Sequence, residues 1–150
     1  DIMIMDKGSI MLTYAIQSGG LALTRALEKG LCLPPSQAEE YKRAYGMDAQ
    51  QFEGKVREVL EPVVKLLVAE IRKAAQYYAS VQGRSPIRTM MLSGGAAYLP
   101  GLSGYLTELL SVEVVLANSI GKLQVLSNLA VPSNVNIFTT AIGLAMHEEE

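Results

Sequence analysis

The hydrophobic pattern changes along the chain from continuous apolar runs to a helical period, which predicts strands first and helices next. Residues 1–5 and 10–17 are apolar at nearly every position, and Asp6-Lys7-Gly8-Ser9 joins them with a glycine that can take positive φ. This pattern predicts an antiparallel hairpin. Because strands that are apolar throughout are usually covered on both faces, we expect both faces of this hairpin to be buried.

Two shorter helices are predicted after the hairpin. The first covers residues 21–29 and stops at Gly30, a plausible C′ glycine. The second opens at Ser36-Gln37-Ala38-Glu39 and ends near Gly46. We interpret its start as a capping box, in which the Ser36 hydroxyl accepts from the N3 amide and Glu39 reaches back.

The longest helix is predicted from Asp48 or Gln51 to about Gln82. Apolar residues recur every three or four positions and give this helix one buried stripe. The stripe consists of Val56, Leu60, Val63, Leu67, Ile71, Ala74 and Tyr78. Pro62 removes a hydrogen bond inside the helix, so we expect a kink or a break at Glu61.

The last part of the chain predicts a βαβ unit followed by a helix. Strands are expected at 87–92 and 112–117, with a helix at 100–110 between them. Residues 118–134 are rich in Asn, Ser and Gly and read as irregular, with a short helix near Leu123. The final helix is predicted at 136–146, and its acidic tail should fray because negative charge is unfavourable at a helix C-terminus.

Composition indicates an ordinary globular protein. The 150 residues are 49% hydrophobic and 19% charged, which suits one domain or two small subdomains with a shared core. The net charge of −2 gives no electrostatic footprint for nucleic acid. No apolar run is long enough to span a membrane.

The single cysteine, Cys32, excludes an internal disulfide and is expected to be a small buried hydrophobe. The chain starts inside a strand pattern, so we expect it to be part of a longer protein.

Chemistry of interest is concentrated in two places. Gly94-Gly95 follows an apolar strand and precedes a proline-started helix. Such a pair is either a tight connection or a site where a phosphate or adenosine group approaches the backbone closely. Glu39 and Lys42 are three residues apart and share a helix face. They are either a capping carboxylate with a solvated lysine, or a carboxylate for a ribose hydroxyl beside a lysine that packs on a base.

Nucleophilic catalysis and metal binding are not indicated. The only histidine, His147, lies in the acidic tail, away from any serine or cysteine partner in the pattern. We therefore expect no catalytic residue and no metal ligand in this chain.

Several segments resemble the second half of the actin-like ATPases. The resemblance is strongest to the type IV pilus assembly protein family PilM and to its relative, the cell-division family FtsA. It covers nearly the whole chain and is most specific at the last two segments. The matching segments are Asp1–Gly8, Gln17–Gly20 with Leu23-Thr24, Ala38–Lys42 with Gly46, Glu70–Arg72 with Tyr77-Tyr78, Leu92–Leu102 and Thr140–Ala145.

This resemblance implies an α/β fold, one actin-type half with an RNase H-like mixed sheet flanked by helices. Residues 1–20 and 84–150 would form the sheet core, and residues 21–83 a helical outer subdomain with the long connecting helix. In the family a phosphate loop and the first strand of this half precede the segment that matches residue 1. That strand lies between the hairpin and the βαβ unit. Its absence would leave unpaired backbone groups, at a cost of several kcal/mol. We therefore expect the missing N-terminal half, or another chain, to complete the sheet.

The resemblance also implies a cofactor, ATP with magnesium, bound in a cleft of the full protein. Gly94, Gly95 and Ala97 would contact the nucleotide from the sheet core, and Glu39 and Lys42 from the outer subdomain. The catalytic groups of the family lie in the other half, so this chain alone should be non-catalytic and should bind ATP weakly or not at all.

Three functions remain open. The first is a PilM-like cytoplasmic scaffold in type IV pilus assembly, peripheral to the inner membrane through membrane-anchored partners, with no membrane insertion of its own and no nucleic-acid partner. The second is an FtsA-like cell-division filament protein, which would be expected to end in an amphipathic membrane helix; residues 147–150 show no basic apolar face. The third is a nucleotide-free structural actin-like module of a secretion system.

Overall fold

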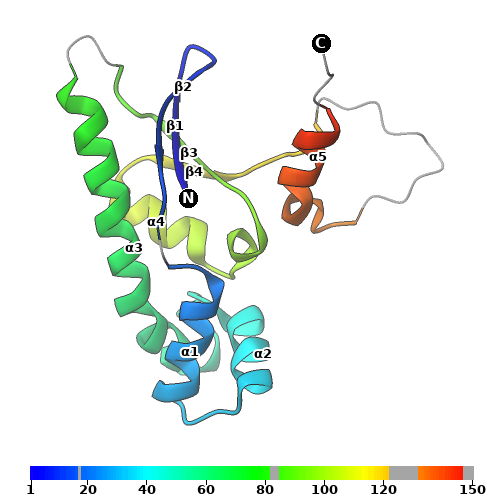
Figure 1. Ribbon diagram of the computed structural model, residues 1–150. Coiled ribbons are helices and arrows are strands. Elements are labelled where there is room, and N and C mark those ends of the chain that lie inside the picture. The colour runs from blue at the N-terminus through cyan, green and yellow to red at the C-terminus, as the bar shows by residue number, and fades with distance from the viewer. Residues whose placement is uncertain (17, 82–84, 122–131, 147–150) are drawn as a thin grey trace.

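Figure 1 shows the computed structural model, which describes residues 1–16, 18–81, 85–121 and 132–146. The N-terminal hairpin consists of β1 (Ile2–Asp6) and β2 (Ser9–Tyr14), paired antiparallel with a register shift between Ile4 and Met5. Lys7 and Gly8 make the turn with φ of 50° and 82°, the left-handed values that the turn sequence predicts. The hairpin prediction is confirmed.

The hairpin is covered on one face only, so the expectation of two buried faces is wrong. The face that carries Ile4, Leu12 and Tyr14 is the more buried one, and the Tyr14 hydroxyl donates to Glu70 Oε2 of helix α3 (Lys55–Ser80) at 2.5 Å. The opposite face of β1 leaves Met3 exposed. The described residues supply one covering helix and no second layer.

The predicted βαβ unit is also present. Strands β3 (Thr89–Leu92) and β4 (Glu113–Leu116) pair in parallel, and α4 (Leu102–Leu110) connects them. Both strands are shorter than predicted. Within the described residues the hairpin and this pair form two separate two-stranded sheets. This separation agrees with the expected gap between the hairpin and the βαβ unit.

Helices α1 (Gly20–Gly30) and α2 (Pro35–Tyr45) follow the hairpin. The predicted capping box at α2 is wrong. Pro34 is the N-cap and the start of α2 has no side-chain cap. Pro35 takes the first helical position, which its fixed φ suits, and so moves the helix start ahead of Ser36. Glu39 is therefore free to bond elsewhere.

Helix α3 begins later than predicted, and of the kink or break expected at Glu61 the break is absent. It begins at Lys55, after a short 3₁₀ turn η1 (Phe52–Gly54) with left-handed backbone at all three residues. It then continues without a break through Pro62. Buried Leu60 and Val64 lie on either side of the proline, and their packing keeps the two parts in one helix although one hydrogen bond is lost. The predicted end at Gln82 lies outside the described residues.

The C-terminal region holds the 3₁₀ turn η3 (Val135–Phe138) and α5 (Thr139–Ala145), which together occupy the predicted last helix. Figure 1 shows α5 set apart from the other helices, at the right of the view. The short helix predicted near Leu123 and the acidic tail lie outside the described residues. Cys32 is exposed, contrary to expectation, because it sits in the turn after α1 with a φ of 53°.

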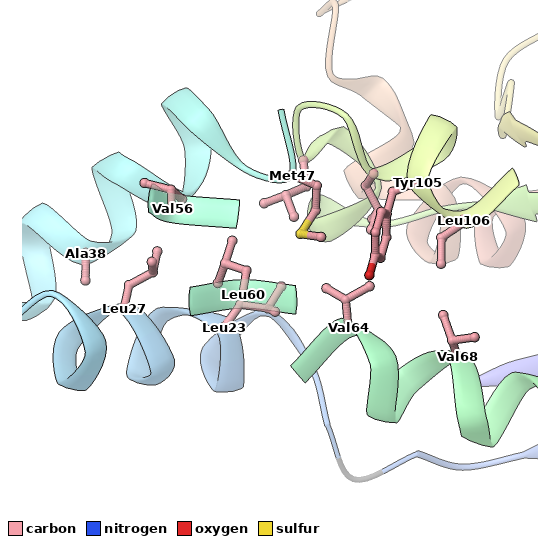
Figure 2. Packing of buried hydrophobic residues seen from close by; sticks show 12 residues of the cluster. Leu23, Leu27, Ala38, Met47, Val56, Leu60, Val64, Val68, Tyr105 and Leu106 are labelled. Atoms are coloured by element: carbon pink, nitrogen blue, oxygen red, sulfur yellow. The ribbon is translucent and has the colours of Figure 1, made fainter. Parts of the chain in front are cut away.

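The hydrophobic core lies among the helices. Leu27, Leu60 and Leu106, from α1, α3 and α4, are each 0% exposed, and Figure 2 shows them in one continuous cluster. The other members are Leu23, Ala38, Met47, Val56, Val64, Val68, Leu99, Leu102 and Tyr105. The cluster draws on residues from both parts of the predicted division into sheet core and outer subdomain, and that division stays a prediction.

Candidate functional site

A pocket of about 600 Å³ lies between four segments of the chain. They are the start of α1, the middle of α2, the start of η2 (Gly95–Tyr98) and the region around η3. This volume lies within the range of small-molecule sites. Its lining comes from segments far apart in the sequence. The lining residues are Gly20, Leu21, Thr24, Glu39, Lys42, Arg43, Gly95, Ala96, Tyr98, Leu99, Asn134 and Ile137.

One wall of the pocket is a polar network between α1 and α2. Lys42 is 8% exposed, and its ammonium donates to Glu39 Oε2 at 2.5 Å, to the Thr24 hydroxyl at 2.9 Å and to the Gly20 carbonyl at 3.2 Å. The Thr24 hydroxyl is also 2.7 Å from Glu39 Oε2. A buried lysine needs such partners, because leaving its charge unpaired would be costly. The solvated-lysine alternative for Lys42 is therefore excluded.

Glu39 is the acceptor at the centre of this wall. Its second oxygen, Oε1, accepts from the exposed Arg43 at 2.8 Å. Hydrogen bonds from Lys42, Thr24 and Arg43 outweigh desolvation and lower the pKa of Glu39 from 4.5 to about 2. The carboxylate is therefore ionised at neutral pH and presents hydrogen-bond acceptors to the pocket.

The opposite wall is the glycine loop, which we define as residues 93–98. Gly94 has a φ of 87°, and its N–H donates to the Asn136 carbonyl at 3.2 Å. The Ser93 hydroxyl donates to Thr139 Oγ1 at 2.8 Å, which ties the loop to α5. Only Gly94 of the pair needs a left-handed backbone. Gly95 does not, and a Cβ added there would meet only Ile137 Cγ2, at 4.0 Å.

The two walls are joined by a close backbone contact next to the pocket. The Met47 N–H donates to the Pro100 carbonyl at 2.7 Å. A Cβ at Gly46 would lie 2.7 Å from Pro100 atoms, and one at Gly101 would lie 2.7 Å from the Met47 carbonyl carbon. Only glycine at both positions allows the end of α2 to approach the start of α4 so closely.

The structure brings together three of the five predicted site residues. Glu39, Lys42 and Gly95 line the pocket. Gly94 and Ala97 belong to the same loop but are not among the lining residues, and Ala97 is buried. The geometry assigns no ligand to any of the five, so their contact with a nucleotide stays a prediction.

Sequence reasoning missed Thr24 and Tyr98 as pocket residues. Thr24 follows the Gly19-Gly20 pair by one helical turn, which was a usable signal once that pair was placed at a helix start. Tyr98 gave no signal, because its position depends on the 3₁₀ turn. Its hydroxyl accepts from the Asn136 N–H at 3.3 Å and so ties η2 to η3.

The described residues offer neither a membrane-spanning helix nor a metal site. No helix in the described ranges is long and apolar enough to cross a membrane. No group of three or more His, Cys, Asp or Glu side chains in those ranges is arranged to hold a metal ion.

Comparison with solved structures shows the fold. The chain superposes on the PilM-PilN type IV pilus biogenesis complex with a TM-score of 0.78 and 23% identity, covering 93% of this chain and 40% of that one. It also superposes on the ethanolamine utilization protein EutJ from Carboxydothermus hydrogenoformans, with a TM-score of 0.66 and 21% identity, covering 96% of this chain and 43% of that one. The chain thus spans less than half the length of either protein. Its fold is that of the actin-like ATPases.

Comparison with curated protein sequences gives no match. The sequence does match a family described as type IV pilus assembly protein PilM, over residues 1–149. Because the match extends over nearly the whole chain, this chain belongs to the PilM family of type IV pilus assembly proteins.

Proposed function

We propose that this chain is the nucleotide-binding half of a PilM-like scaffold in type IV pilus assembly. The observation that carries the proposal is the pocket, in which Glu39 and Lys42 from α2 face Gly95 from the glycine loop. The family resemblance implies a nucleotide role for all three, and Gly95 lies far from Glu39 and Lys42 in the chain. Family membership supports the cellular role.

The proposed ligand is ATP with magnesium. Glu39 accepts from ribose hydroxyls, the stem of Lys42 packs against the base, and the glycine loop allows the adenosine to approach the backbone. The loop residues Gly94 and Ala97 would act with Gly95 from the sheet side. We propose that the phosphates and magnesium are held by parts of the complete protein outside this chain, so the 150 residues alone bind ATP weakly or undetectably.

Thermal melting of the complete natural protein tests nucleotide binding. Adding ATP with magnesium should raise Tm, because a ligand at 100 times its Kd stabilises by about 2.7 kcal/mol. An unchanged Tm at millimolar ATP would favour a nucleotide-free structural module. Micromolar affinity measured on residues 1–150 alone would contradict the proposed division of the site.

The site residue to vary is Gly95. In the complete natural protein, Gly95→Val should abolish the ATP-dependent rise in Tm and leave the Tm without ATP nearly unchanged, because the space at Gly95 accepts a Cβ. Gly104→Val is the matched control, since Gly104 lies in α4 outside the pocket and its Cβ would also meet open space. Retained binding in Gly95→Val would leave the glycine pair as a tight connection only.

We also propose membrane-anchored pilus assembly proteins as partners and a cytoplasmic location peripheral to the inner membrane through them. Support comes from the likeness to the PilM-PilN complex and from membership of the PilM family. Cell fractionation tests this: the protein should sediment with membranes when its assembly partners are present and stay soluble when they are deleted. Membrane binding that persists without partners would favour the FtsA-like alternative.

A further inference from the structure

We propose that Thr24 is a positioning residue for nucleotide binding: its hydroxyl holds Glu39 and Lys42 in place so that Glu39 meets the ribose. This inference rests on the proposed function and adds a residue that the sequence did not assign. Thr24 lies one turn into α1, is 5% exposed and lines the pocket.

The first observation is that the Lys42 ammonium finds all its hydrogen-bond acceptors within this chain. An ammonium has three donors. All three are used by acceptors of this chain: the Gly20 carbonyl, the Thr24 hydroxyl and the Glu39 carboxylate. The ammonium therefore has no N–H left for a nucleotide, so its contribution to the site is to fix the carboxylate and to present its stem.

The second step concerns the direction in which Glu39 is held. Two groups from different helices converge on the same oxygen, Oε2, at 2.7 Å from Thr24 and 2.5 Å from Lys42. The other oxygen, Oε1, has only Arg43, whose side chain is 78% exposed. Oε1 is thus the oxygen that a ribose hydroxyl can reach by displacing a solvent-exposed guanidinium.

The third step is that Thr24 joins both partners. Its hydroxyl accepts from Lys42 and donates to Glu39 or to the Gly20 carbonyl, at 2.7 Å and 3.1 Å. Removing it leaves the Lys42 ammonium one acceptor short in a buried site and takes one donor from Glu39, so the carboxylate and the ammonium end of the lysine, not its stem, have to move. Valine keeps the shape of threonine without the hydroxyl, and serine keeps the hydroxyl.

Two measurements on the complete natural protein test this. The first is the affinity for ATP and for 2′,3′-dideoxy-ATP, which lacks the ribose hydroxyls, with magnesium present. Thr24→Val should weaken the affinity for ATP about tenfold and change the affinity for dideoxy-ATP by no more than about twofold. Thr24→Ser should restore most of the preference for ATP over dideoxy-ATP. Thr107→Val is the matched control, because the exposed Thr107 hydroxyl bonds only the Ser103 carbonyl of its own helix, and it should change neither affinity.

The second measurement needs no nucleotide: an NMR titration of the Glu39 carboxyl. In Thr24→Val its pKa should rise from about 2 toward 4.5, and in Thr24→Ser it should stay near about 2. The inference is overturned if the pKa of Glu39 is unchanged in Thr24→Val. It is also overturned if Thr24→Val weakens the binding of both nucleotides equally, because a merely structural role would produce that result. If the wild-type protein binds neither nucleotide, the proposed function fails, and the role of Thr24 toward the ligand fails with it. The titration then separately decides whether Thr24 holds Glu39.

Discussion

The helices and the sheets of this chain differ in how they bury their apolar residues. In the helical core, Leu27, Leu60 and Leu106 are 0% exposed. In the sheets, Met5 of β1 is 60% exposed and Met91 of β3 is 67% exposed. In sequence the hairpin strands are the more continuously apolar, since the helices carry only an apolar stripe. The difference shows that the helices find their packing partners within the described residues, whereas one face of each sheet does not.

This contrast matters for the site. The α1–α2 wall belongs to the packed region, since α1 and α2 contribute Leu27 and Ala38 to the buried cluster. The glycine loop follows β3 and is held on its other side by η3 and α5, where Leu144 is 72% exposed. We therefore expect changes to the helical core to act mainly on stability, and changes to the sheets to depend on what covers them.

The largest expected effect is on the helical core. Leu60→Ala should lower the free energy of unfolding by about 2–5 kcal/mol, because it leaves a cavity among tightly packed side chains. Leu66→Ala is the matched control in the same helix, since Leu66 is 69% exposed, and it should cost about 0.5 kcal/mol or less. Urea denaturation measures both. Equal costs would break the contrast between packed and unpacked positions.

A smaller effect is expected at the junction of the two walls. Gly101→Ala should cost about 2 kcal/mol or more, because Gly101 has a φ of 72° and a Cβ there would meet backbone atoms of Met47 and Asp48. Gly104→Ala, a helical glycine with open space for a Cβ, should instead stabilise by up to about 1 kcal/mol. Thermal unfolding of the two variants separates backbone strain from a general effect of alanine.

The sheet side sharpens the comparison further. Met91→Ala should change the stability of the 150-residue chain by no more than about 0.5 kcal/mol, because Met91 makes few contacts when it is 67% exposed. In the complete natural protein the same change should cost more if another segment or chain completes the sheet. The same small cost in both would contradict the expectation that the missing N-terminal half or another chain completes the sheet.

A further expected effect is the pH dependence of the α1–α2 wall. The pKa of Glu39 is lowered to about 2, so its ionised form stabilises the fold above pH 4.5, and that contribution is lost as the pH falls from 4.5 toward 2. Glu39→Gln should remove this part of the acid dependence. Melting curves at pH 6 and pH 3 measure it, and an equal drop in Tm for wild type and variant would exclude a role of Glu39.

Local patterns predicted much of the fold. The hairpin, the βαβ unit and the helices follow from periodicity, glycine and proline, because each depends on neighbours in sequence. Predictions failed where distant contacts decide. Packing around Leu60 keeps α3 unbroken through Pro62. At α2 the reason is local: Pro35 starts the helix ahead of Ser36, which leaves Glu39 free to accept from Thr24 of α1. The exposed face of β1 also looked buried in sequence, because an apolar residue does not reveal whether a partner is present.

The candidate site was half predictable for the same reason. Glu39, Lys42 and Gly95 were found from short motifs and from the resemblance that those motifs carry. The contacts of Thr24 with Glu39 and Lys42 became visible only when α1 and α2 were placed side by side. The close approach of Gly46 to Pro100 had no sequence signal beyond the glycines themselves, since it joins residues from two separate predicted helices.

That close approach has a consequence for how the pocket can move. The end of α2 and the start of α4 are in contact through their backbones. The Glu39 wall and the glycine loop therefore cannot move apart to open the pocket. The opposite boundary is packed more loosely, because η3 and α5 leave Phe138 50% and Leu144 72% exposed, although several hydrogen bonds join them to the glycine loop. We therefore expect a ligand to enter by displacement of η3 and α5. Amide exchange at Met47 should be slow, while exchange at Gly94 should be faster and should slow when the pocket is filled.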